Sequence, residues 1–454
     1  MLRTLRSPLA VAALIALLAA AVYWPVVDCG FVWDDDDYVT QNPVLRTLGG
    51  FYCIWFEPRS LPQYYPLVHT TFWLEYRLWG TAPLGYHVVN VVLHAGSAWL
   101  LWRLLEQLAI PGALFAALWF LVHPVHVESV AWVTERKNVL SLVCYLAAAR
   151  SWFCWHDGGT RRHWWIASLW FVAALLSKTV TASLPAALGV VLWWRDGRLT
   201  RRALTGALPW LVLGAAFGWF TVHLEATHVG AADAPWQLVG SERLLVAGRA
   251  VWFYLGSLLW PFGLCFNYPR WELDVTSLLQ WVAPVATLLV VGLALLLHRR
   301  LGRAPAAVLL VFIGTLVPAL GFFDVFPFRY SFVADHFQYH ASLAILVGGS
   351  ALAVPLVARI GHALGSGLGA MVVVCLAIVA HLQVPQYRDF ETLWRQRWRA
   401  IRGRRSRSAT SVHSPTSAAT PRSRATTSNV ACNSIPRATR RSPTSACWPT
   451  ANVT

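Results

Sequence analysis

The sequence predicts an all-α protein that crosses a membrane many times. Of its 454 residues, 57% are hydrophobic and only 13% are charged, whereas soluble domains carry roughly 25% charged residues. Apolar segments recur along the chain with short polar stretches between them. The first of these segments lies directly at the N-terminus. Together these observations predict a bundle of about 11 transmembrane helices.

The N-terminal segment is expected to stay attached as a membrane anchor. It reads MLRTLRSPLAVAALIALLAAAVYWPVV, in which Arg3 and Arg6 precede a long apolar run. A cleaved signal peptide has a shorter apolar core of roughly 7–15 residues. Because this run is long enough to span a bilayer, we expect both arginines to face the cytoplasm.

Further apolar segments follow in order along the chain. Several are shorter than the ~20 residues of a perpendicular helix, so their ends are approximate. The predicted spans are 8–27, 86–107, 111–123, 138–155, 164–177, 179–194, 203–224, 276–297, 305–322, 340–358 and 366–384.

The apolar segment 244–264 is not counted as a span. If it crossed, the basic loop HRRLGR (298–303) would lie outside, against the tendency of basic loops to face the cytoplasm. We therefore expect this segment to lie at the interface or to re-enter. The N-terminus is then inside and the C-terminus outside.

The net charge of +16 is concentrated at the C-terminal end. Thirteen of the 37 basic residues, but only two of the 21 acidic ones, lie from Pro385 onward. The membrane domain, 1–384, is therefore nearly balanced, and no nucleic-acid partner is expected. After a lead-in at 385–398, the tail 399–454 consists mainly of Arg, Ser, Thr, Ala and Pro, which predicts disorder.

On this topology, unusual polar residues gather at the outer face of the membrane. They lie in the first outer loop, 28–85, and in the segments 123–138, 225–236 and 322–340, together with Lys178. Ionisable groups are costly near lipid. We therefore expect a functional site on this face.

The first loop begins with FVWDDDDYVTQNP (31–43), in which Asp34 to Asp37 are consecutive. Such a run fits a solvated end of a helix, and it also fits a catalytic site. Adjacent carboxylates close to lipid have raised pKa values, which suit a general base. The same loop holds Cys29 and Cys53, which either form a disulfide or remain two free thiols.

The segment HPVHVES places His123, His126 and Glu128 close together after a short span that Pro124 ends. Zinc is conceivable here, but the sequence has no HExxH motif and no third ligand nearby. Hydrogen-bonding or acid–base roles are favoured, and the metal ligands, if any, are unknown.

Cationic and further ionisable residues complete the candidate set. Cations that suit a phosphate are Arg136 and Lys137 in TERKN, Lys178 in LLSKTVTASLP and Arg329, although such residues are also common as interfacial anchors. Asp335 and His336 occur with Arg329 in FRYSFVADHFQYH, a dense group of ionisable residues before a span.

These motifs together resemble the membrane module of bacterial relatives of the transmembrane and tetratricopeptide-repeat O-mannosyltransferases. The resemblance rests on FVWDDDDYVTQNP, YYPLVHTTFWLEYRLWGTAPLGYHVVNVVLHAGSAWLL, HPVHVESVAWVTERKNVLS, LLSKTVTASLP and YSFVADHFQYHASLAI, and it covers roughly residues 8–398. That family is similar to the GT-C glycosyltransferases, so a GT-C-like bundle is expected.

The resemblance implies a glycosyltransferase of EC class 2.4. It would move mannose or another hexose from a polyprenyl-phosphate carrier to a hydroxyl group of a protein, lipid or glycan, at the periplasmic face of a bacterial inner membrane. The family's acidic pair matches Asp34 and Asp35, and its second-loop acid matches Glu128. Substrate-binding roles are expected for His123, His126, Arg136, Lys178, Arg329, Asp335 and His336. No cofactor is required, although a divalent ion at the acids is left open.

Two other functions remain open at this point. A transporter or flippase also has many spans, but such proteins often show internal repeats, and none is recognisable between the two halves. An inactive scaffold is the other reading, since YRDFETLWRQRW leads into expected repeats that the tail does not contain. We interpret that tail as a frameshift product, the alternative being a natural basic tail.

Overall fold

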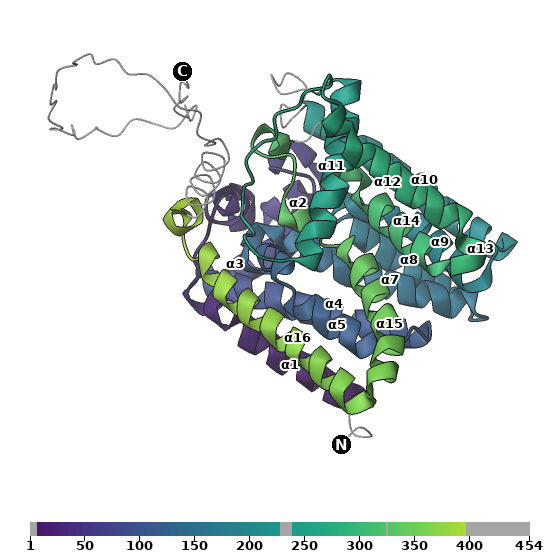
Figure 1. Cartoon of the computed structure of the whole chain (residues 1–454). Coiled ribbons are helices and arrows are strands. Elements are labelled where there is room, and N and C mark those ends of the chain that lie inside the picture. The colour runs from purple at the N-terminus through teal and green to yellow at the C-terminus, as the bar shows by residue number, and fades with distance from the viewer. Residues whose placement is uncertain (1–6, 228–237, 324–325, 396–454) are drawn as a thin grey trace, which may run out of the picture. The chain divides into compact units, whose positions relative to one another are not determined.

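The computed structural model describes residues 7–227, 238–323 and 326–395, and all regular structure in these ranges is helical (Figure 1). Short 3-10 turns and one π-helical turn join the longer helices. The α-helices are α1 (Pro8–Tyr23), α2 (Gly49–Phe56), α3 (Pro66–Trp79), α4 (Pro83–Gln107), α5 (Ala113–Val122), α6 (Val127–Ala131), α7 (Arg136–His156), α8 (Arg161–Leu175), α9 (Leu184–Asp196), α10 (Arg201–Thr227), α11 (Gly240–Leu259), α12 (Leu278–Leu296), α13 (His298–Leu301), α14 (Ala304–Leu316), α15 (Ser342–Ile360) and α16 (His362–Gln383).

Each predicted span overlaps one of these helices, and the chain is a multi-pass membrane protein. In the described ranges, six helical segments are long and apolar enough to cross a bilayer, namely Pro8–Asp28, Pro83–Gln107, Arg201–Leu224, Leu278–Leu296, Ser342–Ile360 and His362–Tyr387. A seventh is added if α5 and the helical segment after it, bent by 53°, count as one span. The total of 11 and the orientation stay predictions.

Local sequence explains several helix boundaries. Proline stands at the first position of α1, α3 and α4, where its missing N–H lies among the donors that a first turn leaves unpaired anyway. Pro124 has the opposite effect on α5, which ends at Val122 as the sequence predicted. The segment 244–264 forms most of α11.

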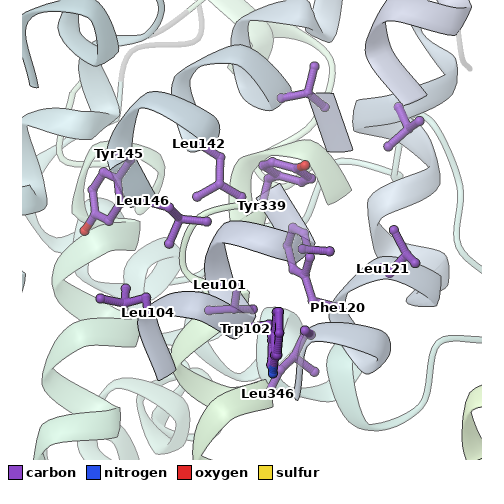
Figure 2. Packing of buried hydrophobic residues seen from close by; sticks show 14 of the residues in the cluster. Leu101, Trp102, Leu104, Phe120, Leu121, Leu142, Tyr145, Leu146, Tyr339 and Leu346 are labelled. Atoms are coloured by element: carbon purple, nitrogen blue, oxygen red, sulfur yellow. The ribbon is translucent and has the colours of Figure 1, made fainter. Parts of the chain in front are cut away.

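The largest apolar core joins helices that are distant in the sequence. Figure 2 shows Leu101 and Trp102 of α4 close to Phe120 of α5, with Leu142 of α7 and Leu346 of α15 in the same cluster. α1 and α16 pack side by side although they come from the two ends of the described chain (Figure 1). Lipid also solvates apolar side chains, so close van der Waals packing holds this bundle together.

The first loop, 28–85, is folded. It contains α2 and α3, and it has its own apolar cluster, which includes Tyr38, Leu45 and Phe72. Arg77 fastens the loop internally by donating hydrogen bonds to the carbonyl oxygens of Leu45 (3.2 Å) and Thr47 (2.9 Å). The acidic run therefore belongs to a defined structure at the end of the helix bundle.

The structure tests the expectation for the cysteines, but two other predicted segments lie mostly or wholly outside the described residues. Cys29 and Cys53 are both free thiols, so the disulfide alternative is excluded for this structure. The outer segment 225–236 lies mostly outside the described residues. The tail 399–454 lies wholly outside them, as does the end of the lead-in, so the predicted disorder and frameshift stay predictions.

Candidate active site

A cavity of about 310 Å³ lies where several distant segments meet, including the α11–α12 connection, which contributes Phe266 and Asn267, and three segments that carry its ionisable residues. These segments are the acidic turn of the first loop, the turns between α5 and α7, and the turns before α15. Its wall contains the aromatic residues Trp33, Tyr38, Trp132, Phe266 and Tyr330. Its ionisable lining residues are Asp34, Asp37, Glu128, Glu135, Lys137 and His336.

Asp35 is a structural carboxylate that faces away from the cavity. It is fully buried. Its Oδ1 accepts hydrogen bonds from the backbone N (2.8 Å) and Oγ1 (2.6 Å) of Thr134, and its Oδ2 accepts one from Val32 N (2.8 Å). Burial and the neighbouring Asp34 raise the pKa of Asp35, whereas these hydrogen bonds lower it. The side chain ties the first loop to the turn before α7.

Asp34 faces the cavity and keeps an available oxygen. Its Oδ1 is buried, and no hydrogen-bond partner for this atom is found among the described residues. Burial raises the pKa of Asp34 to about 6, an effect that Lys137 opposes and Glu135 reinforces. A half-buried carboxyl with a pKa of about 6 and one unpartnered oxygen is suited to accept a proton.

The backbone before Asp34 is strained. Trp33 has φ of 56°, a left-handed conformation that is uncommon for a bulky residue. Its ring packs edge-on against Phe266 and Tyr330, with centroids 5.3 and 5.6 Å away. These contacts hold the turn that directs Asp34 and Asp35 to opposite sides. Strain of this kind is frequent at functional sites.

Glu135 joins two lysines beside the cavity. Its Oε1 lies 3.1 Å from Lys137 Nζ, and its Oε2 lies 3.3 Å from Lys178 Nζ. Burial alone would raise the pKa of Glu135, but His336 and both lysines lower it to about 2. Lys178, which also donates to Asn138 Oδ1 (2.7 Å), has its pKa lowered to about 8 by burial. Two ammonium groups therefore share the Glu135 carboxylate.

Lys137 is the lysine of this pair that lines the cavity. It is 8% exposed, and its Nζ lies 5.4 Å from the ring centre of Tyr38 and 5.6 Å from that of Trp132. The aromatic faces stabilise the ammonium group while excluding water. An ammonium group in this setting attracts an anion more strongly than it would in open solvent.

A second group of ionisable residues, around His336, adjoins Glu135. His336 Nδ1 is 2.7 Å from Glu128 Oε1, and its Nε2 is 3.9 Å from Glu135 Oε1. Burial lowers the pKa of His336 to about 3, so its imidazole is neutral at pH 7. Behind it, Asp335 accepts the Tyr268 hydroxyl at 3.0 Å, and burial raises the pKa of Asp335 to about 7.

The sequence-predicted site residues differ in where they lie relative to the cavity. Asp34, Glu128 and His336 line the cavity. Lys178 and Asp335 are not lining residues. Lys178 pairs with the lining residue Glu135, and Asp335 directly precedes the lining residue His336. Arg329 is exposed, and its guanidinium lies 5.7 Å from the ring of Tyr330, which is part of the wall.

The remaining predicted residues lie away from the cavity. Arg136 is fully buried and donates hydrogen bonds to Glu75, Asn90, Thr71 and the Tyr86 carbonyl oxygen. This set of partners occupies its donors, so the structure does not present it to a phosphate.

The two predicted histidines make structural hydrogen bonds. His123 Nε2 lies 3.1 Å from the Leu258 carbonyl oxygen, and His126 lies between the Phe120 carbonyl oxygen (2.8 Å) and Ser342 Oγ (2.9 Å). Neither lines the cavity. In the described part of the chain, no group of three or more His, Cys, Asp or Glu side chains is arranged to hold a metal ion.

Sequence reasoning left Glu135 out of the site, and of the two cations in TERKN it assigned Arg136 rather than Lys137 to substrate binding. Arg136 and Lys137 are adjacent, and consecutive helical residues point about 100° apart, because a turn holds 3.6 residues. Only one of them can face the cavity. Nothing in TERKN indicates which, because α7 is buried on most sides and shows no clear polar face.

Comparison with known proteins gives relatives of one kind. The Drosophila melanogaster protein O-mannosyl-transferase Tmtc2 is 32% identical over 294 residues, covering 58% of this chain and 31% of the relative. A Caenorhabditis elegans protein O-mannosyl-transferase is 27% identical over 266 residues, covering 54% and 37%. Mouse TMTC3 is 36% identical over 145 residues, covering 30% and 16%.

This chain therefore spans about a third or less of the length of most of these relatives. No family model matches it, and no solved structure matches it.

Proposed function

We propose that this protein is a glycosyltransferase that moves a hexose, mannose by preference, from a polyprenyl-phosphate carrier to a hydroxyl group of a protein acceptor. The similarity to proteins named protein O-mannosyl-transferases supports the reaction class. The setting proposed with it is a bacterial inner membrane, with about 11 spans and the cavity open to the periplasm.

One observation carries the proposal. Asp34, a carboxyl with a free buried oxygen, and Lys137, a buried ammonium group, line the same cavity. Glycosyl transfer from a phosphate carrier needs a base at the acceptor oxygen and positive charge at the leaving phosphate. The cavity offers both within about 310 Å³.

The proposed mechanism is a single displacement. Asp34 removes the proton from the acceptor hydroxyl as that oxygen attacks the anomeric carbon of the sugar. The bond between this carbon and the phosphate oxygen breaks, and its electron pair remains on the phosphate, beside Lys137. The sugar configuration inverts because attack and departure occur on opposite sides. Lys178 does not line the cavity; it acts through Glu135, with whose carboxylate it pairs at 3.3 Å.

The remaining site residues have supporting roles in this account. Asp35 and Thr134 position the turn that carries Asp34. Glu128 holds the neutral ring of His336 in the cavity lining, where it can contact a sugar hydroxyl group.

The test is a transfer assay in membranes with polyprenyl-phosphate mannose and a peptide acceptor. The Asp34→Asn variant removes the base and is expected to lower kcat by roughly 10²- to 10⁴-fold. Asp36→Asn is a matched control, because Asp36 belongs to the same run but is exposed and bonded to Thr40 Oγ1 (2.8 Å). Equal activity in wild type and Asp34→Asn would exclude the proposed base.

A further inference from the structure

A second cavity lies at the end of the bundle that carries α13. Its volume is about 500 Å³, and it is lined by Trp194 of α9 and by His298, Arg299, Gly302, Arg303 and Ala304. In Figure 1, α13 lies at the right edge, away from α2 and α3 of the first loop. This cavity is thus separate from the candidate active site.

The arginines of this cavity carry uncompensated charge. Among the described residues, no ion pair involves Arg299, Arg300 or Arg303. Asp157 and Asp196 both pair with Arg195, at 2.7 and 2.8 Å, and neither forms an ion pair with these three arginines. The cavity therefore attracts anions.

Packing fixes part of this basic group in place. The Arg303 guanidinium lies against Gly197, where an added Cβ would come within 2.6 Å of it. The His298 ring lies 5.9 Å from the ring of Trp193. Two elements, the end of α9 and the α12–α14 connection, thus hold the cationic side chains around the cavity.

The surface leading to the cavity is apolar. α12 has no buried residue within the protein, and it ends directly before α13. Leu293, Leu296 and Leu301 are 53, 78 and 62% exposed. In a membrane these side chains contact acyl chains, and Trp194 is of the residue type that favours the interface.

We propose that this cavity binds the headgroup of an anionic phospholipid, whose acyl chains lie along the exposed leucines of α12. A basic pocket supplies the phosphate site, and the adjoining apolar helix selects a lipid over a soluble phosphate. Basic pockets between transmembrane helices are known to hold such headgroups. The inference does not depend on the proposed transferase activity.

The test is native mass spectrometry of the full chain in a neutral detergent, with phosphatidylglycerol and phosphatidylcholine added in equal amounts. Wild type is expected to retain phosphatidylglycerol preferentially. Arg299→Gln with Arg303→Gln should weaken that retention roughly 10- to 30-fold, since each basic residue near the headgroup contributes about 1 kcal/mol. Arg299→Lys with Arg303→Lys should retain it, which separates loss of charge from loss of folding.

A matched control is Arg161→Gln with Arg162→Gln, which removes the same charge from exposed residues at the start of α8. It is expected to bind as wild type does. Equal loss in both glutamine pairs would contradict a defined site, as would equal retention of phosphatidylcholine. Displacement of the lipid by inorganic phosphate at similar concentration would instead identify a free-anion site and overturn the lipid proposal.

Discussion

Asp34 and Asp35 are neighbours with opposite surroundings. The carboxyl of Asp35 accepts three hydrogen bonds and is fully enclosed, whereas Asp34 lines the cavity and its buried Oδ1 has no hydrogen-bond partner among the described residues. Sequence reasoning treated the two as an equivalent pair. It could not separate them, because the direction of each side chain depends on the left-handed Trp33 and on Thr134, 99 residues further on.

The pH profile of transfer follows from the pKa of Asp34. A base must be ionised, and burial raises the pKa of Asp34 to about 6. Activity is therefore expected to be present above this value and to be lost as pH falls through it. The measurement is kcat/KM between pH 4.5 and 8. A profile without a fall near pH 6 would contradict the role of Asp34.

Thr134 is predicted to act as a positioning residue. The Thr134→Val variant keeps the side-chain shape but removes the 2.6 Å hydrogen bond to Asp35 Oδ1. Because the acceptor is a buried carboxyl group, we expect a loss of roughly 1.5–3 kcal/mol in the free energy of unfolding and a lower kcat. Thr134→Ser restores the hydroxyl and should restore kcat. Failure of Thr134→Ser to restore it would argue against the positioning role.

At the scale of elements, the first loop is held to the bundle by buried polar contacts. Arg136 at the start of α7 pairs with Glu75 of α3, and Asn90 of α4 accepts a third donor of the same guanidinium. The sequence indicated phosphate binding for Arg136, since it shows charge but not burial. The partner, Glu75, lies 61 residues away, and no local pattern joins them.

Removal of this carboxylate is predicted to destabilise the junction between α3 and α7. The Glu75→Gln variant leaves Arg136 buried without its counter-charge, which costs roughly 3–5 kcal/mol in comparable pairs. The free energy of unfolding in detergent measures this loss. Glu75→Leu combined with Arg136→Met should recover most of it, and a Glu75→Gln protein as stable as wild type would show that the ion pair is unimportant.

The helices themselves were largely accessible to sequence reasoning. Long apolar runs predicted α1, α4, α10, α12, α15 and α16, which are the segments long and apolar enough to cross a membrane. The folded interior of the first loop was not predicted. Its aromatic residues form an apolar cluster around short helices.

At the scale of the whole molecule, the candidate site exists only because distant segments meet. Asp34, Lys137 and His336 come from three parts of the chain, and the sequence assigned a site role to Asp34 and His336 but chose Arg136 over Lys137. The segment after α16 also reaches this region, since the Trp394 ring lies 5.7 Å from that of Trp33. The lead-in toward the expected repeats thus contacts the turn that carries Asp34.

The central claim is that Asp34 removes a proton while Lys137 holds the donor phosphate. The most direct test measures donor binding and transfer separately, with a polyprenyl-phosphate sugar and purified wild type, Asp34→Asn and Lys137→Met. We expect Asp34→Asn to bind the donor as wild type does but to transfer it at least about 100-fold more slowly. Lys137→Met should weaken donor binding and slow transfer. Transfer by Asp34→Asn at the wild-type rate, or unchanged donor binding by Lys137→Met, would contradict the account.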